Sequence, residues 1–288
     1  MKNQEEQLVV RWRFDAGRGS LVWQMMFTDT GDLIGQKRCA TSRQALFFGV
    51  EPLTGKVFCD DYLLMDQVQQ SIPAGESWFT GIETTRGGLG YCYACQKYSP
   101  EHQGLWAVDF RRGRVVWSRT DIGFIANLGD EFLVCKTSLF GGFPERHFLF
   151  VDPLSGTEIS KAALDSAQVH AIREAVVPEE VRQRITLPGF VMDGIAQERL
   201  DLERCEVPER SRSESLVYGD LMVVAVHEQS VSTGLWRSSL GVWRMDRLVY
   251  DDRMEEGVDK PCLNNFLIQS NHLYYVRERE ELVCVALS

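Results

Sequence analysis

Two titratable side chains, Glu83 and His102, are the strongest candidates for proton transfer. Glu83 lies in the alternating stretch Trp78–Thr84, which predicts a strand, and His102 lies in the polar segment Lys97–Gly104, which predicts a loop. A carboxylate and an imidazole can work as a general acid–base pair when they reach a substrate within about 3 Å. If the chain is an enzyme or a small-ligand binder, Glu83 and His102 would form such a pair. The favoured interpretation of His102 is a solvent-exposed loop histidine.

The cysteines and the other histidines do not have the spacing of a metal site. Cys92 and Cys95 form a C-x-x-C inside a strand-like run, where residues three apart point to opposite faces. The sequence has no second C-x-x-C, and no two of its five histidines lie close enough together to complete four ligands. The eight cysteines lie mostly in apolar runs, as expected for buried, reduced thiols. We expect no metal and no cofactor.

Motifs that would name an enzyme class are also missing from the sequence. It contains no G-x-S-x-G, no phosphate-binding P-loop and no G-x-G-x-x-G. The glycine-rich segment Arg86–Gly90 joins two predicted strands and does not open a helix, so it predicts a turn. No known catalytic constellation can be read from the chain, and an enzymatic role is the less favoured interpretation.

A repeated hairpin must position these side chains. Each copy is an apolar alternation, a polar turn and a second alternation; the copies are 50–57, 108–117, 151–159 and, more weakly, 242–250. Val108 and Val151 are 43 residues apart, as are Val242 and Val285. A repeat of about 40 to 50 residues is the size of one four-stranded propeller blade. The pattern predicts an all-β, single-domain β-propeller over residues 1–288, with about five four-stranded blades.

The two ends of the chain belong to the same predicted blade. The segment 262–288 stops one strand short, and the segment 8–14 is a strand with nothing before it. We expect residues 8–14 to complete the last blade and close the ring, which would remove two exposed sheet edges.

The stretch 164–213 interrupts the repeat as a partly helical insertion. Leu164–Ile185 has a helical period, within which Pro178 starts a second short turn. The charged segment 203–214 predicts a loop. A decayed sixth blade could lie in the insertion, with strands at 185–192 and 200–207, so five and six blades both stay open.

The clearest hairpin, Leu105–Trp117, resembles the repeats of quinoprotein-like (PQQ-type) propellers. More narrowly, Trp78–Glu83 with Tyr98–Gly104 resembles a bacterial domain family of unknown function. The resemblance implies a β-propeller and carries no activity with it. Quinoprotein dehydrogenases hold their quinone beside adjacent cysteines and a calcium site, and no adjacent cysteine pair occurs here.

Propeller geometry gives the other candidate binding residues. The inner strand of each blade lines the central channel, and polar inner-strand residues could meet a ligand there. These are Gln24, Glu83, Asn127 and Gln269. The adjoining loop face would present Trp78, Tyr98, His102, Arg146 and Trp236. The alternative is that the channel residues bind only ordered water and one another.

The charge and the hydropathy of the chain argue against nucleic acid and membranes as partners. The net charge is −10, from 31 basic and 41 acidic residues, which provides no electrostatic attraction for nucleic acid or an anionic membrane. No export signal and no membrane-spanning run is visible, so we expect a cytoplasmic protein with reduced cysteines.

Three functional hypotheses remain. The favoured one is a non-catalytic scaffold that holds a protein or peptide on its loop face. The second is an enzyme or small-ligand binder that uses the channel with Glu83 and His102. The third places the function in the insertion 164–213. The sequence names no ligand, reaction or oligomeric state.

Overall fold

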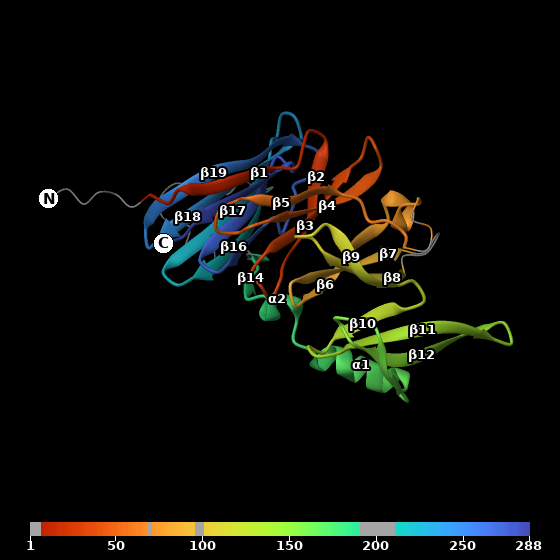
Figure 1. The fold of residues 1–288 in the computed structure, drawn as a ribbon. Coiled ribbons are helices and arrows are strands. Elements are labelled where there is room, and N and C mark those ends of the chain that lie inside the picture. The colour runs from red at the N-terminus through yellow and green to blue at the C-terminus, as the bar shows by residue number, and fades with distance from the viewer. Residues whose placement is uncertain (1–6, 68, 70, 96–100, 191–210) are drawn as a thin grey trace. The chain divides into compact units, whose positions relative to one another are not determined.

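Five antiparallel sheets make up most of the computed structural model, which describes residues 7–67, 69, 71–95, 101–190 and 211–288 (Figure 1). The protein is all-β, as the sequence predicts. The chain divides into two compact units: unit one contains residues 1–18 and 184–288, and unit two contains residues 19–183. Among the described helices, none is long and apolar enough to cross a membrane.

Unit two contains three four-stranded sheets, each built from consecutive strands. The first is β2 (Ser20–Phe27), β3 (Leu33–Cys39), β4 (Gln44–Val50) and β5 (Val57–Tyr62). The second is β6 (Thr80–Arg86), β7 (Leu89–Cys95), β8 (His102–Asp109) and β9 (Arg114–Arg119). The third is β10 (Gly123–Asn127), β11 (Phe132–Phe140), β12 (Phe143–Val151) and β13 (Glu158–Ala162).

Two copies of the repeated hairpin close with the same local chemistry. In the β8–β9 turn, Asp109 Oδ1 accepts a hydrogen bond from the Arg112 backbone N–H at 3.0 Å. In the β12–β13 turn, Asp152 does the same for Ser155 at 2.7 Å. A carboxylate that accepts a hydrogen bond from a backbone N–H three residues later stabilises a turn. The glycine of each copy ends the turn with a positive φ, which is 69° at Gly156. The repeated residues are therefore turn residues.

Unit one contains the other two sheets. One is β20 (Phe266–Gln269), β21 (His272–Arg277) and β22 (Glu281–Ala286), with β1 (Val10–Asp15) paired to β22 and the short β14 (Ile185–Thr186) paired to β20. The other is β16 (Ser211–Tyr218), β17 (Leu221–Gln229), β18 (Trp236–Arg244) and β19 (Arg247–Val258), with β15 (Gly189–Phe190) at the edge. The first and last described strands of the chain are thus neighbours, with Trp12 opposite Cys284.

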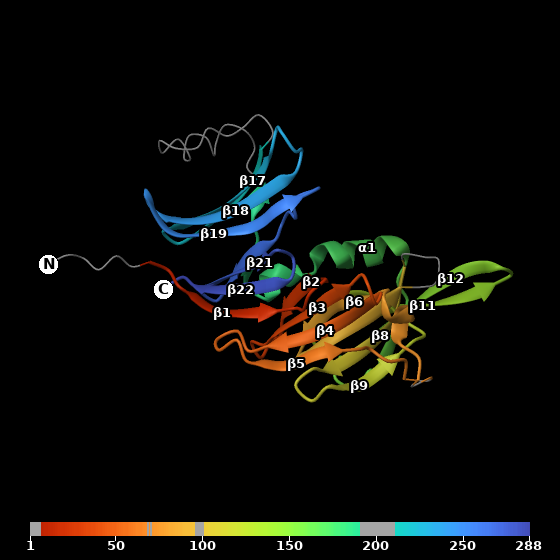
Figure 2. The same cartoon turned by 90° about the horizontal axis from the view of Figure 1, so that it is seen from above.

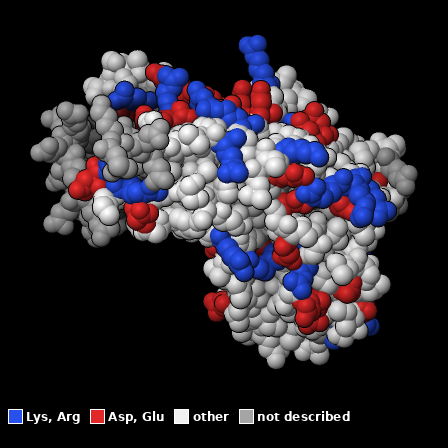
Figure 3. Space-filling model, turned by 60° about the vertical axis from the view of Figure 1, so that its left-hand side comes forward, with Lys and Arg blue, Asp and Glu red and all other residues white. Residues whose placement is uncertain are grey.

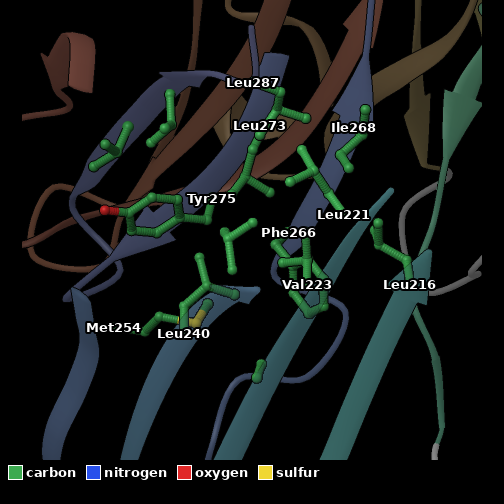
Figure 4. Close-up of a cluster of buried hydrophobic side chains, with 14 of the residues drawn as sticks. Leu216, Leu221, Val223, Leu240, Met254, Phe266, Ile268, Leu273, Tyr275 and Leu287 are labelled. Carbon is green, nitrogen blue, oxygen red and sulfur yellow. The ribbon is translucent and has the colours of Figure 1, made fainter. Parts of the chain in front are cut away.

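The core of unit one joins its two sheets. Alternate residues of β17 and β18 pack against alternate residues of β20 to β22; the labelled side chains in Figure 4 include Leu221, Val223, Leu240, Phe266, Leu273 and Tyr275. This period of two is what the sequence shows as alternation. The cluster fixes which face of each strand is buried.

A polar network lies in the same unit and is almost fully buried. His227 on β17 contacts Ser238 Oγ through Nδ1 at 2.8 Å and Glu214 Oε2 through Nε2 at 3.1 Å. Glu214 and Ser238 are each 1% exposed and His227 is 0% exposed. Glu214 also accepts the Asn264 backbone N–H at 2.9 Å. The predicted loop 203–214 is therefore wrong at 211–214, which form the start of β16.

The insertion contains two helices, and the second begins after Pro178, where the sequence predicts a second short turn. Helix α1 (Ser166–Ala175) begins at a capping box between Asp165 and Gln168, and α2 is Glu179–Arg182. The chain is extended between them because a residue before proline, here Pro178, avoids helical backbone. The short strands β14 and β15 join existing sheets, so the described residues form no sixth sheet.

The surface mixes both signs of charge. On the face shown in Figure 3, basic and acidic side chains lie intermingled. Ion pairs also join residues of opposite charge in unit two: Arg111 Nη2 lies 2.6 Å from Asp32, and Arg112 Nη1 lies 2.8 Å from Asp109. The acidic net charge is therefore not gathered into one uniform patch on that face.

Candidate ligand pocket at Glu83 and His102

Glu83 and His102 are in direct contact. Glu83 Oε2 lies 2.7 Å from His102 Nδ1, and the side chains are 18% and 40% exposed. Glu83 comes from β6 and His102 from β8, the two neighbours of β7. The expected loop at Lys97–Gly104 is wrong at its end, because β8 begins at His102, which pairs with Cys95. A strand therefore fixes the imidazole.

Tyr93 of β7 sets the plane of the His102 ring. The two rings stack with centroids 3.5 Å apart and planes 11° apart. Gly81 of β6 makes room for Tyr93, since a Cβ at Gly81 would lie 2.5 Å from the tyrosine hydroxyl. Burial, followed by nearby Cys95 and Glu83, raises the pKa of Tyr93, so the phenol stays neutral. Three adjacent strands thus hold one oriented imidazole.

The pair lines a pocket of about 610 Å³ in unit two. Its apolar lining includes Ile122, Phe124, Ile125, Phe148 and Val169. Its polar lining includes Glu83, Glu101, His102, Asp121, Cys135, Thr137, Arg146, His170 and Arg173. Ligand sites in proteins commonly combine an apolar lining with a few polar groups in a cavity of this size.

Helix α1 supplies one wall of the pocket. Ser166, Val169, His170 and Arg173 line it, and this spacing places them on one face of the helix. Val169 also packs with Ala126 and Leu133 of the third sheet, which anchors the helix there (Figure 1). The insertion thus contributes directly to the pocket, a role that its helical period alone did not indicate.

The acidic groups of the pocket are paired with basic groups. Arg146 Nη2 lies 3.2 Å from Glu101 Oε1. Asp121 contacts Arg119 and Lys136, each at 3.0 Å, and the Arg119 hydrogen bond in particular lowers the pKa of Asp121 to about 2. Arg173 has no ion pair with the residues that the structure describes.

Two predicted channel residues connect the first strands of neighbouring sheets in unit two. Gln24 of β2 accepts the Ile82 N–H at 3.0 Å. Asn127 of β10 donates to Thr84 Oγ1 at 2.8 Å and to the Thr85 carbonyl at 3.2 Å. Their amides are thus bonded to β6. They lie outside the residues that line the pocket.

Helix α2 and the adjacent Gln183 contact β2 and β6. The sequence predicted a short turn after Pro178 but not these contacts. Thr84 Oγ1 donates to Glu179 at 2.5 Å, and Arg182 donates to the Thr85 carbonyl at 2.6 Å. Gln183 accepts the Phe27 N–H at 2.8 Å, and Glu179 pairs with Arg182. The only available signal was the Glu-x-x-Arg spacing after Pro178, which is common on exposed helices.

The remaining predicted site residues lie elsewhere. Trp78 follows a short 3-10 turn (Ala74–Ser77), and the Arg38 guanidinium lies 5.5 Å from its ring. Trp236 and Gln269 belong to unit one, where Arg212 lies 5.9 Å from the Trp236 ring and Gln269 pairs with Ile185. Tyr98 falls outside the described residues. Of the predicted set, the pocket brings together Glu83, His102 and Arg146.

Comparisons with known proteins show no family for this chain. No protein family and no curated protein matches it. Solved structures similar to it include an acylaminoacyl peptidase of Pyrococcus horikoshii, with TM-score 0.30 and 10% identity, over 95% of this chain and 40% of that one. Another is BBS1N in complex with ARL6DN, with TM-score 0.30 and 7% identity, over 99% and 98% of the two chains. At these scores neither similarity bears on fold or function.

Proposed function

We propose that the five sheets are the blades of a β-propeller that β1 closes. Support comes from the order of the strands, since four sheets contain four consecutive antiparallel strands and β1 gives β20 to β22 a fourth. The short β14 and β15 add a fifth strand to the two sheets of unit one. Hydrogen bonds between inner strands add to it, because Gln24 links β2 to β6 and Asn127 links β6 to β10. Membership in the quinoprotein-like repeat class remains part of this proposal.

Within this fold, the function that we propose is the binding of a small organic ligand in the pocket of unit two. The observation that carries the proposal is the 2.7 Å contact between Glu83 and His102 in the pocket lining. The Glu83 carboxylate only accepts hydrogen bonds, so a neutral His102 carries its proton on Nδ1 and leaves Nε2 as an acceptor. A ligand hydroxyl or amine can donate to Nε2. If the ligand is a substrate, the same nitrogen is a general base.

The test is a ligand screen on the wild-type chain and on His102→Gln. We expect compounds that raise the melting temperature of the wild type to lose at least tenfold in affinity in the variant, by calorimetry. His147→Gln is the matched control, because His147 is exposed and does not line this pocket. Hits that bind the wild type and His102→Gln equally, or an absence of hits at millimolar concentration, would overturn the proposal.

A second candidate function, the holding of a protein partner, rests on the β11–β12 hairpin. Its residues 136–147 pair with each other beyond the reach of β10 and β13, and the hairpin extends outward in Figures 1 and 2. Leu139, Phe140 and Phe143 are 76%, 78% and 78% exposed. Exposed aromatic side chains of this kind are enriched at protein interfaces.

The partner hypothesis is tested with Phe140→Ser combined with Phe143→Ser. Because both rings are exposed, we expect an unchanged melting temperature and the loss of specific proteins captured by the wild type. Leu154→Ser, at another exposed apolar residue, is the control. The same captured proteins in all three chains would rule the hairpin out as a partner site.

A further inference from the structure

The distribution of charge around the pocket points to the chemical class of its ligand, and this step rests on the proposed ligand-binding function. Each acidic group in the lining is already engaged: Glu83 with His102, Glu101 with Arg146, and Asp121 with two basic side chains. Among the basic groups, the Arg173 guanidinium has no ion pair with described residues. The lining therefore offers one guanidinium, that of Arg173, without a carboxylate partner among the described residues.

The Arg146–Glu101 pair can be shared with a ligand. Both side chains are more than half exposed, at 60% and 58%, and exposed ion pairs add little stability. Arginine binds a carboxylate through two parallel hydrogen bonds, so Arg173 and Arg146 are suitable partners for a planar acid group. A dianion such as a phosphate monoester would bring a second negative charge beside Glu83 and Glu101 without a second free cation.

The rest of the pocket is suited to an apolar body. Phe124, Phe148 and Val169 line it, and a charged ligand without an apolar part would leave these side chains uncovered. His102 provides an acceptor for a donor group on the same ligand. We infer that the pocket takes an amphipathic monocarboxylate, with the acid group at Arg173 and Arg146 and an apolar body against Phe124 and Phe148.

The experiment compares 3-phenyllactate with its neutral amide by calorimetry at low ionic strength. We expect the acid to bind the wild type at least tenfold more tightly than the amide. In Arg173→Gln we expect this preference to disappear, with a loss of at least tenfold in the affinity for the acid. Arg114→Gln is the control for overall charge, since Arg114 is an exposed residue of β9 that does not line the pocket.

The outcomes separate the ligand class from the pocket itself. If the acid and the amide bind equally well, or if Arg173→Gln keeps the preference for the acid, the monocarboxylate inference is wrong. Neutral compounds whose binding is still lost in His102→Gln would then leave the pocket standing as a ligand site. If no compound, charged or neutral, loses affinity in His102→Gln, both the ligand-binding function and the monocarboxylate inference are wrong.

Discussion

The protein contains two groups of hydrogen-bonded polar side chains that differ in their exposure to solvent. Glu83 and His102 are partly exposed and line a pocket, whereas Glu214, His227 and Ser238 have similar chemistry but are sealed in unit one. A Ser–His–Glu contact pattern by itself would suggest a hydrolase, but a catalytic serine must reach its substrate. Only Glu83 and His102 are exposed enough to reach a ligand.

The sealed constellation should be structural. We expect Glu214→Ala to lower the free energy of unfolding by about 3 kcal/mol, because it leaves His227 and the Asn264 N–H without their buried acceptor. Glu228→Ala is the matched control on the neighbouring strand β17, since the partner of Glu228 is the exposed Arg237, and should cost less than about 1 kcal/mol. Urea titrations measure both. Equal losses in the two variants would contradict this account.

Asp121 should make the free energy of unfolding depend on pH in the acidic range. Its folded pKa of about 2 lies below the usual unfolded value of about 3.9, so its contribution is present above about pH 4 and is lost as the pH falls toward 2. Asp121 is 51% exposed, which limits the contribution at neutral pH to about 0.5–1 kcal/mol. Asp121→Asn should therefore destabilise the protein at pH 6 and lose most of this effect by pH 2. A deficit that is undiminished at pH 2 would point to another cause.

At the scale of elements, the sequence predicted strands well where apolar alternation was regular. The hairpin predicted at 108–117 turns between β8 and β9, and Glu83 meets His102 because β6 and β8 flank one strand. The residues 211–214 were missed because a buried Glu214 has the hydropathy of a loop residue. The connection between Glu179 and Thr84 was also beyond prediction, since it joins segments far apart in the sequence. The periodicity of a short segment cannot predict contacts with distant parts of the chain.

Helix α2 should hold the inner strands of unit two together. Arg182 is 17% exposed and donates to the Thr85 carbonyl and to Thr84 Oγ1. We expect Arg182→Ala to cost about 2 kcal/mol, since hydrogen bonds from charged groups to buried acceptors are worth roughly 1.5–3 kcal/mol. Hydrogen exchange should show faster exchange along β6. Arg112→Ala, in an exposed turn, should leave exchange on β6 unchanged; a similar change there would refute the role of α2.

At the scale of the whole molecule, the first strand of the chain is a core element of unit one. Trp12 and Phe14 on β1 are 7% and 3% exposed, and the Trp12 ring lies 5.9 Å from Tyr274. The sequence suggested this pairing through an unfinished last repeat. It did not indicate two compact units, because the hairpin repeat runs through both.

Removing the Trp12 side chain should be far more damaging than removing an exposed tryptophan. We expect Trp12→Ala to cost about 3–5 kcal/mol through the cavity that it leaves beside β22. Trp23→Ala, at a residue 56% exposed, should cost less than about 1 kcal/mol. Guanidinium titration followed by circular dichroism compares them. Similar midpoints for the two variants would show that β1 is dispensable.

The pairing of β1 with β22 also determines the order of events during synthesis. Residues 19–183 are contiguous and leave the ribosome long before β22 is made, so unit two can fold as an independent body. Until β22 is made, β1 has no strand to pair with and its Trp12 and Phe14 remain uncovered. Pairing β1 with β22 then closes a loop over residues 16–280, a slow step in folding. Newly made chains therefore pass through a period in which β1 is open to chaperones and to aggregation.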